Sequence, residues 1–301
     1  MKNNIRDKMH NDIIQKEMVN FVQKYWGLAS SPFDTVPNPN LFYFSTTHKE
    51  GILRIVYAIK GRKGAAMLTG EVGSGKSTVT RLLIQRLLGL NYDVALINNP
   101  TFSGLDFLRE IIFQLGIEST NCDKCLLYRK FNERLLQNSK QGKDTVIFID
   151  EAQAIGDMAT FEELRMLLNF HSNDKFLLTL ILVGQPNLRN MVAGICQFEQ
   201  RVAVSYHLEP LPLVDTARYI IYRMEKCGIQ TNIFTNNALK LIYQYTSGIP
   251  RLINHLCDMC LLSGCLSKAK KIAPDIVEYV ISDRGVPIHR QRLSPVRVAN
   301  G

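Results

Sequence analysis

The sequence predicts an α/β fold of three layers, with a parallel sheet between two layers of helices, followed by a smaller all-helical domain. Two observations support the α/β part. Apolar runs of strand length alternate with helical patterns up to residue 208, and a glycine-rich turn at residues 70–77 joins one such run to a helix. The all-helical part rests on a third observation, because from Leu213 onward only helical patterns follow.

Four runs have the length and composition of strands, and they cover residues 65–69, 92–97, 145–149 and 176–183. A fifth segment, at residues 201–208, alternates like a closing strand. The helical patterns between them cover residues 46–60, 78–88, 105–115 and 125–137. Cap-forming residues from Ser45 to Thr47 precede the first of these helices. Strands joined through helices pair in parallel, with helices on both faces of the sheet. The second domain is expected to contain helices at residues 214–226, 236–245, 251–267 and 274–281.

These patterns divide the chain of 301 residues into four parts. We expect an N-terminal helical extension over 1–25, the α/β domain over 26–210, the helical lid domain over 211–283 and a basic tail over 284–301. The tail has four arginines and no acidic residue, so it is either a solvated, disordered segment or an arm that contacts phosphates. The extension has one apolar face, which would pack either on its own domain or on a neighbouring subunit. Its residues are Ile14, Met18, Phe21, Val22 and Tyr25.

Composition narrows the class of protein. The formal charge of +9 favours a polyanionic partner such as nucleic acid. No apolar run reaches the roughly 18 residues that a membrane span requires, and the N-terminus lacks the apolar core of a signal peptide. We therefore expect no membrane span and a cytoplasmic location. Seven cysteines at scattered positions are typical of free thiols, and the C-x-x-C pairs at 122/125 and 257/260 are too far apart in sequence to favour a shared zinc site.

The turn at residues 70–77 fits the phosphate-binding pattern G-x-x-x-x-G-K-[ST] at every constrained position. Its glycines allow successive backbone N–H groups to face phosphate oxygens, and the N-terminus of the following helix adds positive partial charge. Lys76 would contact the β- and γ-phosphates, and Ser77 would ligate Mg²⁺. The predicted contacts of the nucleotide in this turn are Gly70, Glu71, Val72, Gly73, Ser74, Gly75, Lys76, Ser77 and Thr78.

Two carboxylates follow the predicted strand at 145–149, and ligands of open α/β sheets bind at the carboxyl ends of the strands. Asp150 suits the Mg²⁺ shell, directly or through water, and Glu151 suits a general base that polarises the attacking water. Alone, the pair would be read as an acidic turn, but the phosphate-binding turn favours the catalytic interpretation. Gln185, after the next strand, is a candidate sensor of the γ-phosphate or an ordinary turn residue.

The ordered set of motifs resembles the AAA+ ATPases typified by ExeA (general secretion pathway protein A) and the pilus-biogenesis protein MshM. The resemblance runs from about residue 26 to residue 280 and is carried by residues 26–28, 32–33, 37–39, 68–77, 148–153, 182–186, 200–201 and 248–254. It implies a P-loop NTPase sheet in which the Gln185 strand lies between the strands that lead to Gly70 and Asp150. It also implies that ATP and Mg²⁺ are the cofactors.

The resemblance further implies roles for three arginines. Arg251 would be the lid arginine, called sensor 2, which touches the nucleotide and couples hydrolysis to lid motion. Arg201 looks like a finger offered to the γ-phosphate of a neighbour, with Arg189 as the alternative, so that hydrolysis would depend on a homo-oligomeric ring or filament. The alternative for Arg251 and Arg201 is an arginine that forms a surface ion pair. The adenine base would be held near the segment that contains Phe33 and His48.

The expected activity is Mg²⁺-dependent ATP hydrolysis used as an assembly or conformational switch. By resemblance to ExeA and MshM, the switch would assist a secretion or pilus apparatus. The alternative is an ATP-dependent regulator of transposition that binds double-stranded DNA and recruits a transposase, because ExeA-like ATPases also resemble TnsC and IstB. The sequence lacks the membrane span and peptidoglycan-binding domain of ExeA, so envelope anchoring stays open. A third hypothesis is a nucleotide switch that does not hydrolyse ATP, which the intact Asp150 and Glu151 disfavour.

Overall fold

The computed structural model describes residues 19–34, 39–98, 100–119, 122–172 and 175–283. These residues form two compact units. Among these residues, one unit contains the sheet and comprises the described part of Val36–Leu211 with Ile249–Arg251. The other unit is helical and comprises 19–34, Pro212–Gly248 and 252–283. The predicted extension before residue 19 and the predicted tail at 284–301 lie outside the described residues.

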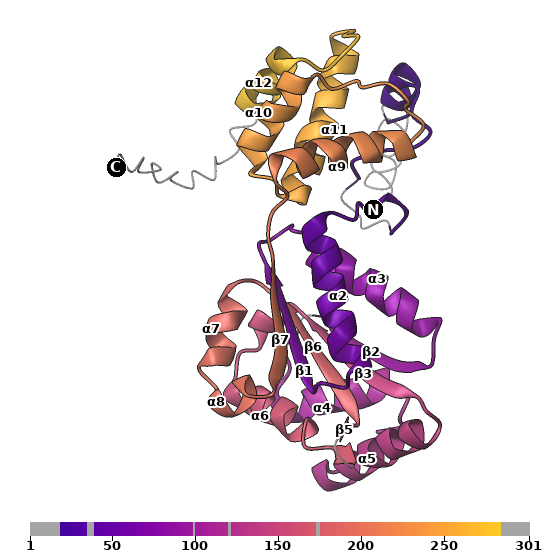
Figure 1. The fold of residues 1–301 in the computed structure, drawn as a ribbon, viewed down its shortest axis with the longest axis vertical. Helices are drawn as coiled ribbons and strands as arrows, with labels where there is room; N and C mark the ends of the chain where they lie inside the picture. The colour runs from indigo at the N-terminus through magenta and orange to yellow at the C-terminus, as the bar shows by residue number, and fades with distance from the viewer. Residues whose placement is uncertain (1–18, 35–38, 99, 120–121, 173–174, 284–301) are drawn as a thin grey trace, which may run out of the picture. The chain divides into compact units, whose positions relative to one another are not determined.

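The sheet has five parallel strands in the order β2 (Tyr92–Asn98), β3 (Asp144–Asp150), β6 (Leu178–Gly184), β1 (Ala65–Gly70) and β7 (Val202–Leu208) (Figure 1). The expectation that β6 lies between β1 and β3 is confirmed. Because all five strands run the same way, their carboxyl ends lie along one edge of the sheet.

Helices cover both faces of this sheet, as predicted. Figure 1 shows α2 (Thr46–Lys60) and α3 (Lys76–Leu88) together on one side. The other face packs against α4 (Gly104–Gln114), α5 (Lys124–Lys140), α6 (Met158–Leu167), α7 (Asn187–Ala193) and α8 (Cys196–Glu199).

Alternation along the strands separates two hydrophobic cores. Ala66 and Leu68 of β1 pack with α2 and α3, whereas Ala65 and Met67 pack with the helices of the opposite face. Successive side chains of a strand point to opposite faces, so a strand covered on both sides is apolar at every position. This is why β1, β3 and β6 read as continuous apolar runs, with β6 buried along its whole length.

Helix and strand bounds follow local signals closely. The hydroxyl of Ser45 caps α2 by accepting a hydrogen bond from the backbone N–H of His48 at 3.2 Å, as the sequence predicts. One strand differs from the prediction: β6 begins at Leu178, because Lys175–Phe176 (β5) pairs instead with His171–Ser172 (β4) in a two-stranded ribbon. The sequence analysis also passed over α6, α7 and α8, and two 3₁₀ turns, η1 (Pro39–Leu41) and η2 (Ala152–Ala154).

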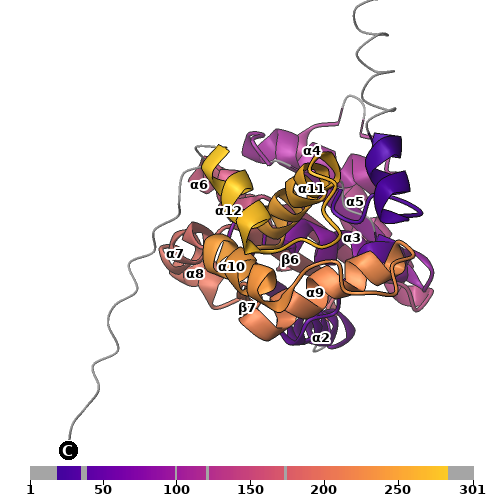
Figure 2. The same cartoon turned by 90° about the horizontal axis from the view of Figure 1, so that it is seen from above.

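The helical unit contains α9 (Leu213–Lys226), α10 (Asn236–Thr246), most of α11 (Pro250–Leu266) and α12 (Pro274–Asp283). Figure 2 shows α10 between α9 and α12, and it contacts both. All four were predicted within about two residues, since each has a clear apolar face.

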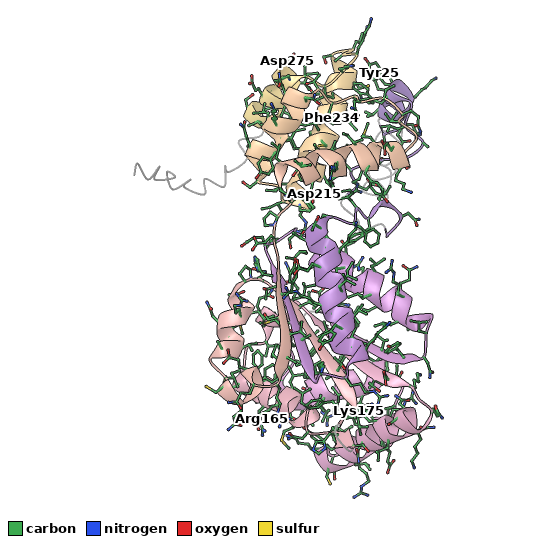
Figure 3. The ribbon with its side chains drawn as sticks, viewed as in Figure 1. Tyr25, Arg165, Lys175, Asp215, Phe234 and Asp275 are labelled. Atoms are coloured by element: carbon green, nitrogen blue, oxygen red, sulfur yellow. The ribbon has the colours of Figure 1, made fainter. Side chains whose placement is uncertain are left out.

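The segment at 26–34 belongs to the helical unit, whereas the sequence analysis placed it in the α/β domain. The indole N–H of Trp26 donates to the carbonyl of Leu261 at 2.8 Å, and the guanidinium of Arg223 donates to the carbonyl of Pro32 at 2.5 Å. Phe33 stacks edge-on against Phe234, which lies inside this unit (Figure 3). These contacts join residues far apart in sequence.

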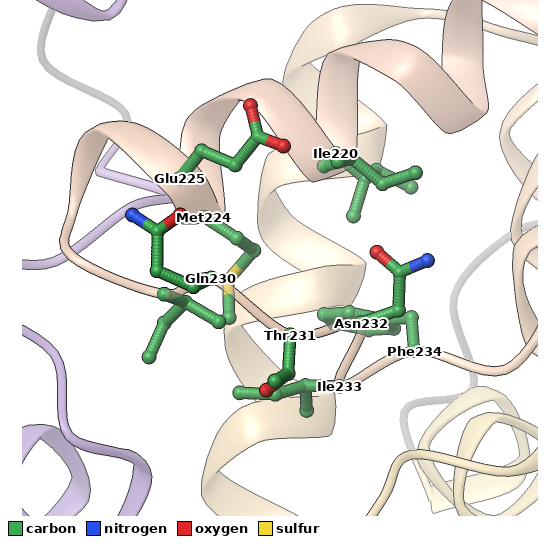
Figure 4. A pocket seen from close by; sticks show the side chains of 10 residues that line it. Ile220, Met224, Glu225, Gln230, Thr231, Asn232, Ile233 and Phe234 are labelled. Atoms are coloured by element: carbon green, nitrogen blue, oxygen red, sulfur yellow. The ribbon is translucent and has the colours of Figure 1, made fainter.

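Figure 4 shows a pocket in the helical unit, and it is partly open to solvent. It lies between α9 and the following loop and is lined by Ile220, Ile221, Met224, Glu225, Ile229, Gln230, Thr231, Asn232, Ile233 and Phe234. Glu225 is its one ionisable side chain, so it offers no constellation for phosphate chemistry. Across the part of the chain that the structure describes, no helix is both long and apolar enough to cross a bilayer.

Candidate nucleotide-binding site

The phosphate-binding turn connects β1 to α3 at the carboxyl edge of the sheet, as the sequence predicts. Two of its glycines have positive φ, 82° at Gly73 and 101° at Gly75. A Cβ on Gly75 would lie 2.8 Å from Nε2 of His48, and one on Gly73 would lie 2.6 Å from Cβ of Arg251. Both positions therefore require glycine, for backbone conformation and for space.

Lys76 is the first residue of α3 and is buried, with 5% of its surface exposed. Its ammonium donates hydrogen bonds to the carbonyls of Gly70 at 2.8 Å and Glu71 at 2.9 Å. Burial lowers the pKa of Lys76, while the negative charges of Glu151 and Asp150 oppose that shift. The buried positive charge of Lys76 thus has neutral carbonyls of its own turn as hydrogen-bond partners, which fits a site that binds an anion.

The turn holds a second sign of a site for an anion. The hydroxyl of Ser74 is buried, and it has no hydrogen-bond partner among the described residues. Buried hydroxyls are normally paired. The backbone N–H groups in the first turn of α3 also have no partner within the helix. Together these groups fit a phosphate at the N-terminus of α3.

His48 supports this turn, a contact that the sequence analysis missed. Its Nδ1 lies 2.6 Å from the hydroxyl of Ser45, and its Nε2 lies 3.2 Å from the carbonyl oxygen of Ser74. His48 is buried, with 4% exposed, and its ring packs edge-on against Phe42. The imidazole thus braces the backbone of the phosphate-binding turn. Phe33, the other residue named near the adenine base, packs inside the helical unit.

Asp150 and Glu151 end β3 at the same edge of the sheet. Asp150 is 8% exposed, and its Oδ1 accepts a hydrogen bond from the backbone N–H of Glu151 at 3.0 Å. Glu151 has the left-handed conformation, with φ 52° and ψ 38°. A residue other than glycine adopts this conformation only where its surroundings hold it there, and such strain clusters at functional sites.

Gln185 follows β6 directly and is tied to this carboxylate pair. Its backbone N–H donates to Oε1 of Gln153 at 2.9 Å, and Nε2 of Gln153 donates to Oε2 of Glu151. The structure therefore brings together Lys76, Glu151 and the Gln185 turn from three neighbouring strands. Gln153 was not a predicted site residue, although it lies in the motif at 148–153 that carries the family resemblance, two residues after Glu151.

The donor set fits Mg²⁺ better than a metal held entirely by protein. Ser77 lies in the first turn of α3 and is partly exposed, and Asp150 supplies a carboxylate. Among the described residues there is no group of three or more His, Cys, Asp or Glu side chains that could hold a metal. Mg²⁺ is usually held by one or two protein oxygens, with waters and phosphate oxygens completing its shell.

Arg251, in the first turn of α11, groups with the sheet unit. Its backbone N–H donates to the carbonyl of Gly73 at 3.2 Å, and its charge lowers the pKa of Lys76. Its side chain is exposed. The backbone of Arg251 thus lies next to the phosphate-binding turn, and contact of its side chain with the nucleotide stays a prediction.

Arg201 lies at the opposite end of the sheet. Its carbonyl accepts a hydrogen bond from the N–H of Ala65, the first residue of β1, at 3.1 Å. The phosphate-binding turn follows the last residue of β1, six residues along, which is about 20 Å away at the rise of a strand. Arg201 therefore cannot reach the site of its own chain. Its guanidinium contacts Asn169 and lies over the ring of Phe176. Arg189, exposed on α7, lies just after Gln185.

Comparisons with known proteins show the family and the fold of this chain. The model of the AAA domain family matches residues 59–192. General secretion pathway protein A of Aeromonas hydrophila is 37% identical over 253 residues, which are 83% of this chain and 46% of that protein. The chain thus spans about half the length of this relative.

Solved structures share the fold at low sequence identity. The Aeropyrum pernix ORC2 protein has a TM-score of 0.62 at 19% identity and covers 84% of this chain and 71% of its own. Cdc6p from Pyrobaculum aerophilum has a TM-score of 0.66 at 14% identity, covering 84% and 70%. The RuvB branch migration motor of Thermotoga maritima has a TM-score of 0.52 at 17% identity, covering 78% and 68%.

Gly75→Ala should greatly weaken binding of a fluorescent ATP analogue. The new Cβ would displace His48, and an alanine at φ 101° would strain the backbone of the turn. Gly116→Ala is the matched control, since Gly116 also has positive φ, 69°, but a Cβ there would meet no described atom within 4 Å. Both variants should lower the melting temperature through backbone strain. Equal affinities for the two variants would show that the shape of this turn does not govern binding.

Proposed function

We propose that this chain, which belongs to the AAA+ ATPase family and is related to general secretion pathway protein A, binds ATP with Mg²⁺ and hydrolyses it as an assembly or conformational switch. The observation that carries this proposal is the buried ammonium of Lys76, which donates to the carbonyls of Gly70 and Glu71 in a turn where the buried hydroxyl of Ser74 has no partner among the described residues. A buried lysine in such a turn, at the same edge of the sheet as the carboxylates of Asp150 and Glu151, fits phosphoryl transfer to water.

Each residue then has a step. Lys76 exchanges the carbonyls of Gly70 and Glu71 for phosphate oxygens and neutralises charge that develops on them. Glu151 orients a water in line with the γ-phosphate and accepts its proton, so that ATP and water yield ADP, phosphate and a proton. Ser77 and Asp150 would hold Mg²⁺, which supplies further neutralisation of the phosphate charge. Gln185 contacts the γ-phosphate, and Arg251 couples the nucleotide to the helical lid.

Glu151→Gln should bind ATP with near-normal affinity but hydrolyse it roughly 100-fold or more slowly, because the amide cannot accept the proton of water. Lys76→Ala should instead lose the rise in melting temperature that ATP and Mg²⁺ give to a folded chain that binds them. Glu118→Gln, at an exposed carboxylate on the surface, is the control for charge removal. Wild-type turnover by Glu151→Gln would contradict the assignment of the base.

The position of Arg201 supports hydrolysis shared between copies of the chain. Since Arg201 lies at the far end of its own sheet, it can act on a nucleotide only in a neighbour, in a ring or filament. An arginine supplied in this way contributes roughly 10³- to 10⁵-fold to turnover in other phosphoryl-transfer enzymes.

Turnover per chain should therefore rise with protein concentration, and Arg201→Ala should remove the rise. A mixture of Arg201→Ala and Glu151→Gln, each inactive alone, should regain activity, because a chain with intact Glu151 can take Arg201 from its neighbour. Mixing Arg201→Ala with Lys76→Ala should do the same. Concentration-independent turnover, or no recovery on mixing, would exclude the shared site, and Arg189→Ala in the same assay tests the alternative finger.

For the cellular role, we favour assistance to a secretion or pilus apparatus, by relation to general secretion pathway protein A over 83% of this chain. The second candidate, a DNA-binding regulator of transposition, is favoured by the charge of +9 and by three exposed lysines between α11 and α12, Lys268, Lys270 and Lys271. Phosphate contacts of such lysines would provide affinity for duplex DNA without sequence preference.

If the second role holds, the chain should bind duplex DNA with ATP, and the affinity should fall steeply as salt rises because bound phosphates release counterions. Exchanging Lys270 and Lys271 for glutamine should reduce the slope of log affinity against log salt by about two if each contacts a phosphate. The matched control exchanges Lys49 and Lys60, both exposed on α2. Absence of DNA binding at low salt, with and without ATP, would exclude this role.

A further inference from the structure

Gln153 lies in η2, immediately beyond the carboxylate pair, and its amide is bonded at both ends. Its Oε1 accepts the backbone N–H of Gln185 at 2.9 Å, and its Nε2 donates to Oε2 of Glu151. The orientation of the amide is fixed by chemistry, because the backbone N–H of Gln185 can only donate and an ionised carboxylate can only accept. One amide thus joins the proposed base to the proposed sensor turn.

The end of β6 has the shape that this amide requires. A Cβ on Gly184 would lie 2.5 Å from Oε1 of Gln153 and 2.8 Å from Cδ2 of Leu188. Gly184 does not have positive φ, so its backbone conformation does not call for glycine. Glycine is required at this position because the Gln153 amide and the Leu188 side chain leave no room for a Cβ.

The base is held at several points. The backbone N–H of Glu151 donates to Oδ1 of Asp150, and its left-handed φ of 52° directs the start of η2. The hydrogen bond from Gln153 engages Oε2 of the carboxylate. A carboxylate fixed through one oxygen presents the other in a defined direction, and orientation of this kind is a large part of catalytic efficiency.

We propose that Gln153 is a positioning residue for ATP hydrolysis: its amide orients Glu151 and ties that carboxylate to the Gln185 turn, so that contact of the γ-phosphate with Gln185 reaches the base through one side chain. This inference rests on the proposed function, since it assigns a partner to the same base. Gln153 itself contacts neither the water nor the phosphate. Its effect is on kcat and on the coupling between Gln185 and Glu151.

Two substitutions separate the two bonds. Gln153→Met has similar size and removes both, whereas Gln153→Glu keeps an acceptor for the N–H of Gln185 and loses the donor to Glu151. Both variants should lower kcat by roughly 10- to 100-fold, the loss expected when a catalytic group is misplaced by about an ångström. The KM for ATP and the affinity for a non-hydrolysable analogue should stay within about twofold, because binding energy held equally in ground and transition states is untouched.

Hydrogen exchange provides a readout that needs no nucleotide. The Gln185 amide should exchange faster in Gln153→Met than in the wild type, because its acceptor is gone, and at the wild-type rate in Gln153→Glu. Unchanged melting temperatures would show that the effect is local. Equal exchange of this amide in Gln153→Met and the wild type would overturn the geometry on which the proposal stands.

A double-mutant cycle tests whether Gln153 acts through Glu151. In the Glu151→Gln background, Gln153→Met should cause no further loss of turnover, because residues that act as a unit are not additive. A full further loss would mean that Gln153 acts on another group, and wild-type kcat in Gln153→Glu would mean that the donor bond is not needed. Either result overturns the proposal, whereas wild-type turnover by Glu151→Gln alone would instead overturn the proposed base.

Gly184→Ala should reproduce the effects of Gln153→Met on kcat and on exchange of the Gln185 amide. Its Cβ has no room beside the amide oxygen. Gly156→Ala, in the loop after η2, is the matched control, since a Cβ there would have no described atom within 4 Å. Wild-type behaviour of Gly184→Ala would contradict the proposal.

Discussion

The parallel register of β1, β6 and β3 is the constraint on which the candidate site depends. Thr69 of β1 pairs with Gly184 of β6, and Ile149 of β3 pairs with Leu182 of the same strand. This register sets the phosphate-binding turn, the carboxylates and Gln185 at one edge. Since all three strands are buried on both faces, a slip by one residue would exchange the two cores and is strongly opposed.

Local patterns were enough to predict the strands, most helices and the phosphate-binding and carboxylate motifs, because each is encoded within a few consecutive residues. The contacts of His48 and Gln153 could not be found in this way, although His48 was named near the adenine base and Gln153 lies in the motif at 148–153. The partner of each residue, Ser74 or Gln185, comes near only when the strands and α2 have assembled. The grouping of Trp26 with the helical unit was missed for the same reason, because its partner Leu261 is 235 residues away.

The turn also shows how a site for phosphate is stabilised before phosphate arrives. Lys76 satisfies two of its donors with carbonyls of the same turn, and two nearby carboxylates offset part of the unfavourable burial of its charge. The buried hydroxyl of Ser74 has no such substitute in the part of the chain that the structure describes. A bound phosphate would thus replace the carbonyl partners of the Lys76 ammonium and would give the Ser74 hydroxyl its first hydrogen-bond partner.

The close approach of Gly184 and Gln153 has a consequence for how this sequence can diverge. At many glycines backbone conformation alone forbids replacement, but at Gly184 the obstacles are two neighbouring side chains, those of Gln153 and Leu188. Alanine at 184 would be accommodated only where both residue 153 and residue 188 leave this space, and an alanine fixed there would then prevent the return of glutamine at 153. We therefore expect the three positions to depend on one another, so that the order of their substitutions matters.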